Sequence, residues 1–212
     1  MRLSARLVGL LAALAVFTAG TPVLAGPTYG FFNITNNSAG DAAIGEAQFF
    51  LEVLPEGDNV RFRFYNIGPE ASALTDVYFD DGSLFGIASI INGTGVLFSA
   101  PANPPDLPGG NNVVPPFVAT VGFSADSDPP VASNGVNPGE ELSIVFALQS
   151  GKTYADVLDD LGSATLRVGI HVQGFAGGGS ESFINIVPAP GAVVLCILGT
   201  GLVGRLRRRR WL

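Results

Sequence analysis

The chain has 212 residues and a formal net charge of −7, with 28 glycines, 15 prolines and one cysteine. All 18 carboxylates lie between residues 41 and 181, together with only four of the 11 basic residues, so this central region carries a net charge of −14. Nucleic acid and anionic membranes need a basic footprint, and are therefore disfavoured as partners. The one cysteine, Cys196, lies outside this region, which excludes disulfides, thiolate metal sites and cysteine nucleophiles from it.

The N-terminus has the pattern of a secretory signal peptide. Arg2 and Arg6 precede an apolar run at residues 7–17, and Val-Leu-Ala follows at 23–25. Small or apolar residues at those positions suit signal peptidase. We therefore predict a signal peptide over residues 1–25, with cleavage between Ala25 and Gly26.

Residues 26–186 have the pattern of an all-β domain, with short apolar runs between clusters of glycine, proline, asparagine, aspartate and serine. The clearest strand is 60–65, where apolar residues at 60, 62 and 64 alternate with Arg61, Arg63 and Tyr65. It pairs with 49–54 across a turn at 55–59 that contains proline and glycine. The pattern predicts a single antiparallel β-sandwich or jelly-roll-like domain.

Other elements follow along the chain. The further predicted strands are 74–79, 84–91, 95–99, 117–124, 141–149, 165–175 and 182–187. We predict one helix at 154–161, with Thr153 as N-cap and Gly162 as its end. Residues 101–116, with six prolines, and residues 123–138 are predicted to be loops, which either bind something or cap an edge.

The C-terminus has three parts. Val187, Pro188, Ala189 and Pro190 precede an apolar run at 191–204, and the basic segment 205–212 contains Arg205, Arg207, Arg208, Arg209 and Arg210. The apolar run predicts a short transmembrane helix with the arginines on the cytoplasmic side and the central domain outside. An ordinary membrane anchor, or the last strand and helix of a globular domain, are the alternatives.

This order of proline motif, apolar helix and arginine cluster resembles the PEP-CTERM sorting signal, with Ala189 standing where that motif has glutamate. The resemblance implies an exosortase that recognises and removes the tail as the protein reaches the cell surface or extracellular matrix. Segments 74–82, 122–130, 137–140 and 169–175 also resemble a recurring ectodomain of PEP-CTERM proteins. That ectodomain implies an architecture and no assigned activity.

One carboxylate set could bind calcium, which is available outside the cell and prefers six to eight oxygen ligands. The candidates are Asp76, Asp80, Asp81, Asp126 and Asp128. Their spacing does not match the 12-residue helical calcium loop. Acidic turns on a solvated surface are the alternative, and no other cofactor is indicated.

Catalytic residues are harder to identify from the sequence. Glu140, Glu141 and Glu181 are available for a glycosidase pair, but nothing in the sequence places two carboxylates together. The single histidine, His171, falls on the polar face of its predicted strand beside Arg167 and Gln173, so we expect it to be exposed. No Gly-x-Ser-x-Gly motif follows a strand.

Three functions fit these observations. The favoured one is an exported, non-enzymatic surface or extracellular-matrix protein with a structural or adhesive role, and extracellular polysaccharide as a candidate partner. The alternative is a calcium-assisted carbohydrate-binding module. The second alternative is a hydrolase that uses an unrecognised carboxylate pair.

Overall fold

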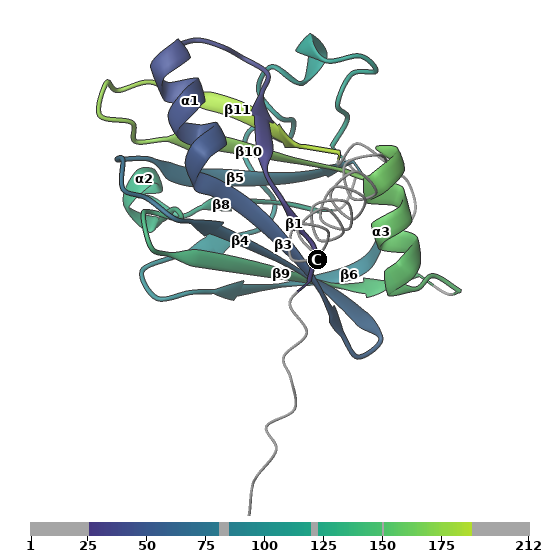
Figure 1. The fold of residues 1–212 in the computed structure, drawn as a ribbon. Helices are drawn as coiled ribbons and strands as arrows, with labels where there is room; N and C mark the ends of the chain where they lie inside the picture. Colours follow the sequence, from purple (N-terminus) through teal and green to yellow (C-terminus); the bar gives the residue numbers. More distant parts are fainter. Residues whose placement is uncertain (1–25, 81–84, 120–122, 150, 188–212) are drawn as a thin grey trace, which may run out of the picture.

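The computed structural model describes residues 26–80, 85–119, 123–149 and 151–187 (Figure 1). Within these ranges eleven strands form two antiparallel sheets. The five-stranded sheet has the order β1 (Thr28–Tyr29), β3 (Phe49–Glu56), β4 (Asn59–Asn66), β9 (Glu141–Leu148), β6 (Phe85–Asn92). The six-stranded sheet has the order β2 (Phe31–Asn33), β11 (Glu181–Asn185), β10 (Arg167–Gln173), β5 (Ala73–Asp80), β8 (Ser124–Ser127), β7 (Phe98–Ser99). The all-β prediction is confirmed.

The predicted hairpin forms the centre of the five-stranded sheet. β3 and β4 pair from Phe49 opposite Asn66 to Glu56 opposite Asn59, around a two-residue turn at Gly57 and Asp58. Gly57 has a φ of +62°, which glycine adopts without the steric cost that a Cβ would bring. As the alternation predicted, positions 60, 62 and 64 are fully buried.

The two sheets pack face to face through phenylalanine side chains. Phe79 of the six-stranded sheet makes edge-to-face contacts with Phe62 and Phe146 of the other sheet, at centroid distances of 5.1 and 4.8 Å. Edge-to-face aromatic pairs add about 0.5–1.5 kcal/mol to the free energy that their buried area supplies. The result is a sandwich-like core with contributions from both sheets.

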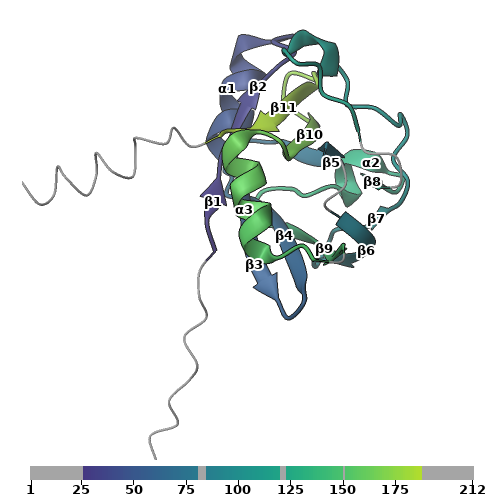
Figure 2. The same ribbon diagram turned by 90° about the vertical axis from the view of Figure 1, so that its right-hand side faces the viewer.

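Two ten-residue helices lie against the sheets (Figure 2). α3 (Tyr154–Ser163) begins at the predicted N-cap Thr153, which forms a capping box with Asp156. It buries Val157 and Leu161 in the core. The predicted end was wrong, because Gly162 stays helical and the left-handed residue is Ala164, with a φ of 60°.

The other helix, α1 (Ala39–Gln48), was not predicted. Its residues include two glycines and form only a weak apolar stripe, so a periodicity search finds little there. A local signal does exist, since the Ser38 side chain accepts the Asp41 N–H in an N-cap. The two-residue β1 and three-residue β2 were also missed.

Several strand boundaries were wrong, and one strand was misplaced. Residues 117–119 form no strand, and β8 instead occupies Ser124–Ser127 within the predicted loop 123–138. That loop also contains α2 (Val131–Asn134). Three other predicted strands have different bounds in the structure. The predicted strand 95–99 is only Phe98–Ser99 (β7), 165–175 is Arg167–Gln173 (β10), and 182–187 is Glu181–Asn185 (β11). The cause at 117 is tertiary, because Phe117 packs onto the outside of the six-stranded sheet.

The segment 101–116 carries no strand, as predicted, and contains one short 3-10 helix, η1 (Gly110–Asn112). It is more than a surface loop, because Ala102, Leu107 and Gly110 are buried. Proline there removes backbone donors, so the segment contributes side-chain packing in place of ladder hydrogen bonds.

The first and last segments of the described domain lie side by side in the six-stranded sheet. The Ile186 N–H donates to the Gly30 carbonyl at 2.8 Å, just beyond the pairing of β2 with β11. The predicted signal peptide and the tail from 188 onward lie outside the described residues. In the part that is described, no helix is both long and apolar enough to span a membrane.

Because every described strand and helix lies between residues 28 and 185, we predict that a fragment of residues 26–187 folds alone. It should unfold in a single cooperative urea transition, as small single domains do. The control is a fragment ending at residue 180, which removes β11 from between β2 and β10. A non-cooperative transition for 26–187, or equal stability of both fragments, would contradict the prediction.

Candidate functional site

A polar row crosses the outer face of the six-stranded sheet. Successive antiparallel registers place Ser182 of β11 opposite His171 of β10, His171 opposite Asp76 of β5, and Asp76 opposite Asp126 of β8. Ser99 of β7 is opposite Asp126. We call these five residues the polar row.

Asp76 faces outward because it alternates with the core residues Val77 and Phe79, and a bulge follows immediately on its N-terminal side. Asp76 pairs with His171 and Leu74 with Val172, so Thr75 is an extra residue of β5 without a partner position in β10. Leu74 and Val77 can therefore both face the core even though they are three positions apart. The broken alternation at 74–77 was the sequence signal for this bulge, and the prediction of a plain strand passed over it.

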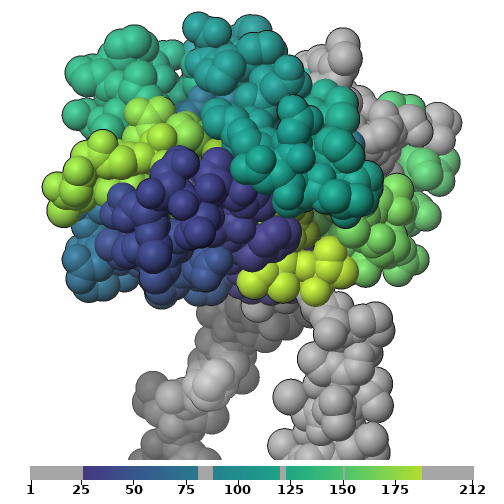
Figure 3. All heavy atoms as spheres, turned by 90° about the horizontal axis from the view of Figure 1, so that it is seen from above, coloured from purple at the N-terminus to yellow at the C-terminus, as the bar shows by residue number. Residues whose placement is uncertain are grey.

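The proline-rich segment 101–118, which we call the cover, lies over this outer face. Leu107 and Phe117 pack against Tyr78 and Ile184 in a second apolar cluster, distinct from the core between the sheets. In the space-filling view of Figure 3 the cover is the teal surface beside the purple N-terminal segment. The central strands of the six-stranded sheet are thus buried on both faces.

Close packing of the cover depends on a glycine in β10. A Cβ on Gly169 would lie 2.7 Å from Leu107 Cδ2 and 3.0 Å from Phe117 Cζ. Real Cβ contacts are longer than this, so a side chain at 169 would push the cover away from the sheet. This explains why the alternation of β10 is interrupted by glycine on its outer face.

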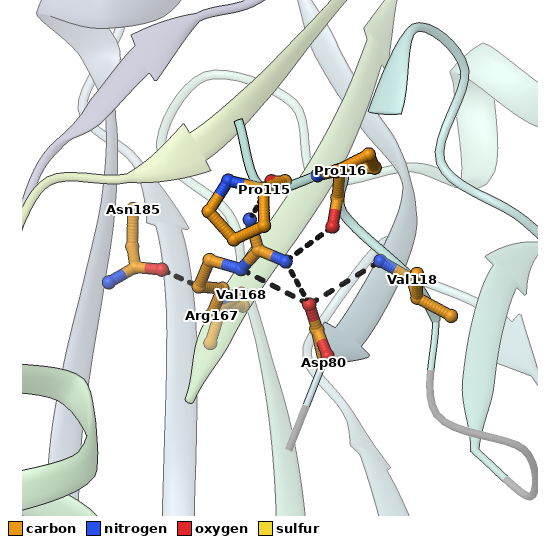
Figure 4. A network of polar contacts seen from close by, with 7 residues as sticks. All are labelled: Asp80, Pro115, Pro116, Val118, Arg167, Val168 and Asn185. Carbon is orange, nitrogen blue, oxygen red and sulfur yellow. Dashed lines mark hydrogen bonds and ion pairs between the residues drawn. The ribbon is translucent and has the colours of Figure 1, made fainter. Parts of the chain in front are cut away.

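Arg167 ties the cover to the sheet (Figure 4). Its Nε donates to Asp80 Oδ2 at 3.1 Å, and Nη2 also contacts Asp80. The same guanidinium donates to the carbonyls of Pro115 and Pro116, each at 2.7 Å. It also lies 5.4 Å from the centre of the Phe117 ring. A planar guanidinium with five donors suits this combination, which an ammonium could not reproduce.

Asp76 is a buried carboxylate within the polar row, so its charged form is disfavoured. It is 4% exposed, and burial, together with the charge of Asp126, raises its pKa to about 6, although the Thr75 hydroxyl donates to it at 2.7 Å. Burial and the Asp76 charge likewise raise the pKa of Tyr78 far above its ordinary value. The Tyr78 hydroxyl donates to the Pro104 carbonyl at 2.9 Å, which adds another attachment for the cover.

His171 and Ser182 form the other end of the row. His171 Nδ1 lies 2.9 Å from Ser182 Oγ, and Ser182 is fully buried. Burial lowers the pKa of His171, and the charge of Glu181 opposes that shift only in part. The prediction of an exposed histidine was wrong, because the ring is half-buried.

Glu181, at the start of β11, anchors the N-terminus of α1. It is fully buried and accepts hydrogen bonds from Asn33 Nδ2, the Thr35 hydroxyl and the Ser38 N–H at 2.9, 2.5 and 2.6 Å. Burial alone would raise its pKa, but these donors together lower it. Glu181 therefore helps to hold the segment that leads into α1.

The structure separates most of the predicted site residues. Of the calcium candidates, Asp76 and Asp126 are opposite each other, Asp80 pairs with Arg167, and Asp128 accepts the Ser99 hydroxyl at 2.6 Å. Asp81 lies outside the described residues. Within the described ranges no three histidine, aspartate, glutamate or cysteine side chains are grouped as a metal site. Calcium binding stays a prediction.

The glutamates considered for a hydrolase lie in separate networks. Glu140 accepts the Asn137 N–H at 2.9 Å in a turn, whereas Glu141 pairs with Arg63 on the outer face of the five-stranded sheet. Of the sorting residues only Val187 is described, and of the signal cleavage pair only Gly26, whose N–H donates to Glu52.

Comparison with known proteins identifies no relative: no family model, no curated protein and no solved structure matches this chain. Thr75, Tyr78 and Ser182 were not predicted as site residues, because their roles depend on the strand register and on the cover.

The buried Asp76 predicts a pH-dependent stability. Because its folded pKa is raised from an ordinary 3.8 to about 6, the folded state holds the proton more tightly than the unfolded state. Asp76 by itself should thus lower the free energy of unfolding as pH rises from 4 towards 7, by on the order of 3 kcal/mol, whereas the lowered pKa of His171 acts in the opposite direction over part of this range. Asp76→Asn removes this loss, and should stabilise the domain at pH 8 but change little at pH 4.

Urea unfolding at several pH values measures this effect. The matched control is Asp58→Asn in the exposed hairpin turn, which should leave the pH profile as it is. If Asp76→Asn had the same pH profile as the wild type, the burial of an ionisable carboxylate at this position would be refuted.

Proposed function

We propose that this chain is an exported, non-enzymatic protein of the cell surface or extracellular matrix. Its sandwich domain has a structural or adhesive role there, and its C-terminal signal is recognised by an exosortase. Signal peptidase acts at Ala25 and Gly26, and the membrane holds the chain by its tail until that tail is removed.

The observation that carries the proposal is the position of the domain in the chain. The first strand begins at Thr28 and the last ends at Asn185. These bounds leave two residues after the predicted signal cleavage and one before the motif at 187–190. Every described strand lies between the two predicted targeting segments, so removal of both is compatible with a folded product.

The burial of Asp76 and Ser182 supports a non-enzymatic role. Enzyme sites are usually concave and open to substrate, whereas Asp76 is 4% exposed and Ser182 is fully buried, although Asp126 and His171 are partly accessible and Ser99 is exposed. One acceptor of the row also holds the cover, since the Asn103 N–H donates to Asp126 Oδ2 at 3.2 Å.

The open face of the five-stranded sheet gives further support. Tyr65 stacks on Phe50 with centroids 5.8 Å apart, and the guanidinium of Arg63 lies 5.1 Å from the Tyr65 ring centre. Arg63 in turn pairs with Glu52 and Glu141. The ring is thus held within a packed array, which suits a durable surface better than a free stacking platform for sugars.

Mass spectrometry of the C-terminus tests the proposal. The native protein is recovered separately from membranes and from the extracellular fraction. We expect the extracellular form to end near residues 188–190. A variant that changes Pro188 and Pro190 to alanine should stay in the membrane fraction with its tail intact, because it lacks the motif. Substitution of Val114→Ala, an exposed position of the cover, is the control and should be processed normally.

An intact tail ending at Leu212 in every fraction would contradict exosortase processing. Extracellular protein cut at the same place in the proline variant would contradict the assignment of the motif.

A further inference from the structure

The two sheets have four edges, and within the described residues three of these are formed by very short strands. β1 and β7 have two residues each and β2 has three. Short edge strands are a known protection against pairing with other chains. The fourth edge is β6, which spans eight residues, Phe85–Asn92 (Figure 2).

β6 also lacks the other protective devices. Its sequence contains no charged residue and no proline. Natural edge strands use lysine, inward charges or proline to prevent pairing. Ser89 and Ile91 are exposed, and Ile91 is 44% accessible. A long edge without charge or proline is therefore available on a domain that is otherwise strongly acidic.

One side of β6 pairs with β9, in register from Ala88 opposite Phe146 to Asn92 opposite Leu142. On the other side, no described residue forms a backbone hydrogen bond with residues 88–91. At the end of the strand the Asn92 side chain exchanges hydrogen bonds with the backbone of Phe98, at 2.9 and 3.3 Å. Within the described residues, the backbone donors and acceptors of 88–91 that point away from β9 thus have no backbone partner.

We propose that this edge pairs with the same edge of a second copy of the chain. Antiparallel pairing of a strand with itself about a two-fold axis is self-complementary, because both copies present the same row of donors and acceptors. The two five-stranded sheets then become one continuous sheet. This inference concerns the sandwich itself and does not depend on how the tail is processed.

The strongly negative charge of the domain favours contact between two copies at the uncharged edge of β6. Each domain carries 18 carboxylates and four basic residues, so two copies repel each other at most orientations. Along β6 and the facing part of β9 the outward neighbours are uncharged, with Ser89 opposite Val145 and Ile91 opposite Ser143. Contact centred on residues 88–91 therefore brings no carboxylate of β6 itself to the junction.

A single strand pair makes a small interface. Interfaces below about 1,200 Å² in total are weak or transient, so the dimer forms reversibly at micromolar or higher concentrations. Salt screens the repulsion between two acidic copies, so added salt strengthens the dimer. A basic or nucleic-acid-binding interface would show the opposite salt dependence.

Sedimentation velocity of the 26–187 fragment tests the proposal, once its cooperative unfolding has been verified. The wild type should shift from monomer to dimer with concentration and more strongly at high salt. Ile91→Lys should weaken dimerisation at least about tenfold, since lysine on an edge opposes pairing. The matched control is Ile67→Lys, which makes the same change at an exposed isoleucine outside the strands, 59% accessible, and should dimerise like the wild type.

Ser89→Lys gives a second variant on the same edge, and unfolding by urea checks that each variant is folded. Amides of residues 88–91 should also gain protection from hydrogen exchange as concentration rises. A wild type that stays monomeric up to about 1 mM, equal weakening by Ile67→Lys, or a dimer that tolerates both edge lysines would overturn the proposal.

Discussion

The structure depends on apolar packing against both faces of the six-stranded sheet. The described domain contains no cysteine, so no disulfide holds these layers together. One face meets the phenylalanine core, and the other would expose Tyr78, Ile184 and the polar row. The cover solves this through apolar packing at Leu107 and Phe117, with its carbonyls bound by Arg167. Burial on both faces explains why β5 reads as a nearly continuous buried strand. It also explains the buried Asp76, which has to remain in an environment that disfavours its charge.

The sequence predicted the parts of the fold that follow local rules. Strict alternation identified β4, and Thr153 as an N-cap identified the start of α3. The errors arose where tertiary packing decides. Phe117 has the pattern of a strand residue but packs as part of the cover, and the extra residue Thr75 in β5 lets Leu74 face the core against the alternation. Of the candidate site, the sequence named Asp76, Asp126 and His171, but their alignment required the strand order β11-β10-β5-β8.

These features support one account of function. On the outer face of the six-stranded sheet Asp76 accepts the Thr75 hydroxyl and His171 lies against Ser182, so their hydrogen bonds link groups within the domain. What stays open is the charged array around Arg63 and the uncharged edge at β6. An acidic sandwich with an edge suited to self-association fits the proposed structural or adhesive role at the cell surface. Assembly between copies would extend that role.

The central claim is that the cover is a permanent layer of the fold. Hydrogen exchange on the 26–187 fragment, followed by mass spectrometry, tests it most directly. The account predicts that amides bonded within the cover, such as Gly110 and Phe117, exchange as slowly as those of β5 and β10. It also predicts that Arg167→Gln speeds exchange in the cover first. Fast exchange of the wild-type cover above a protected sheet would contradict the account, because the cover would then be a lid that opens over an accessible site.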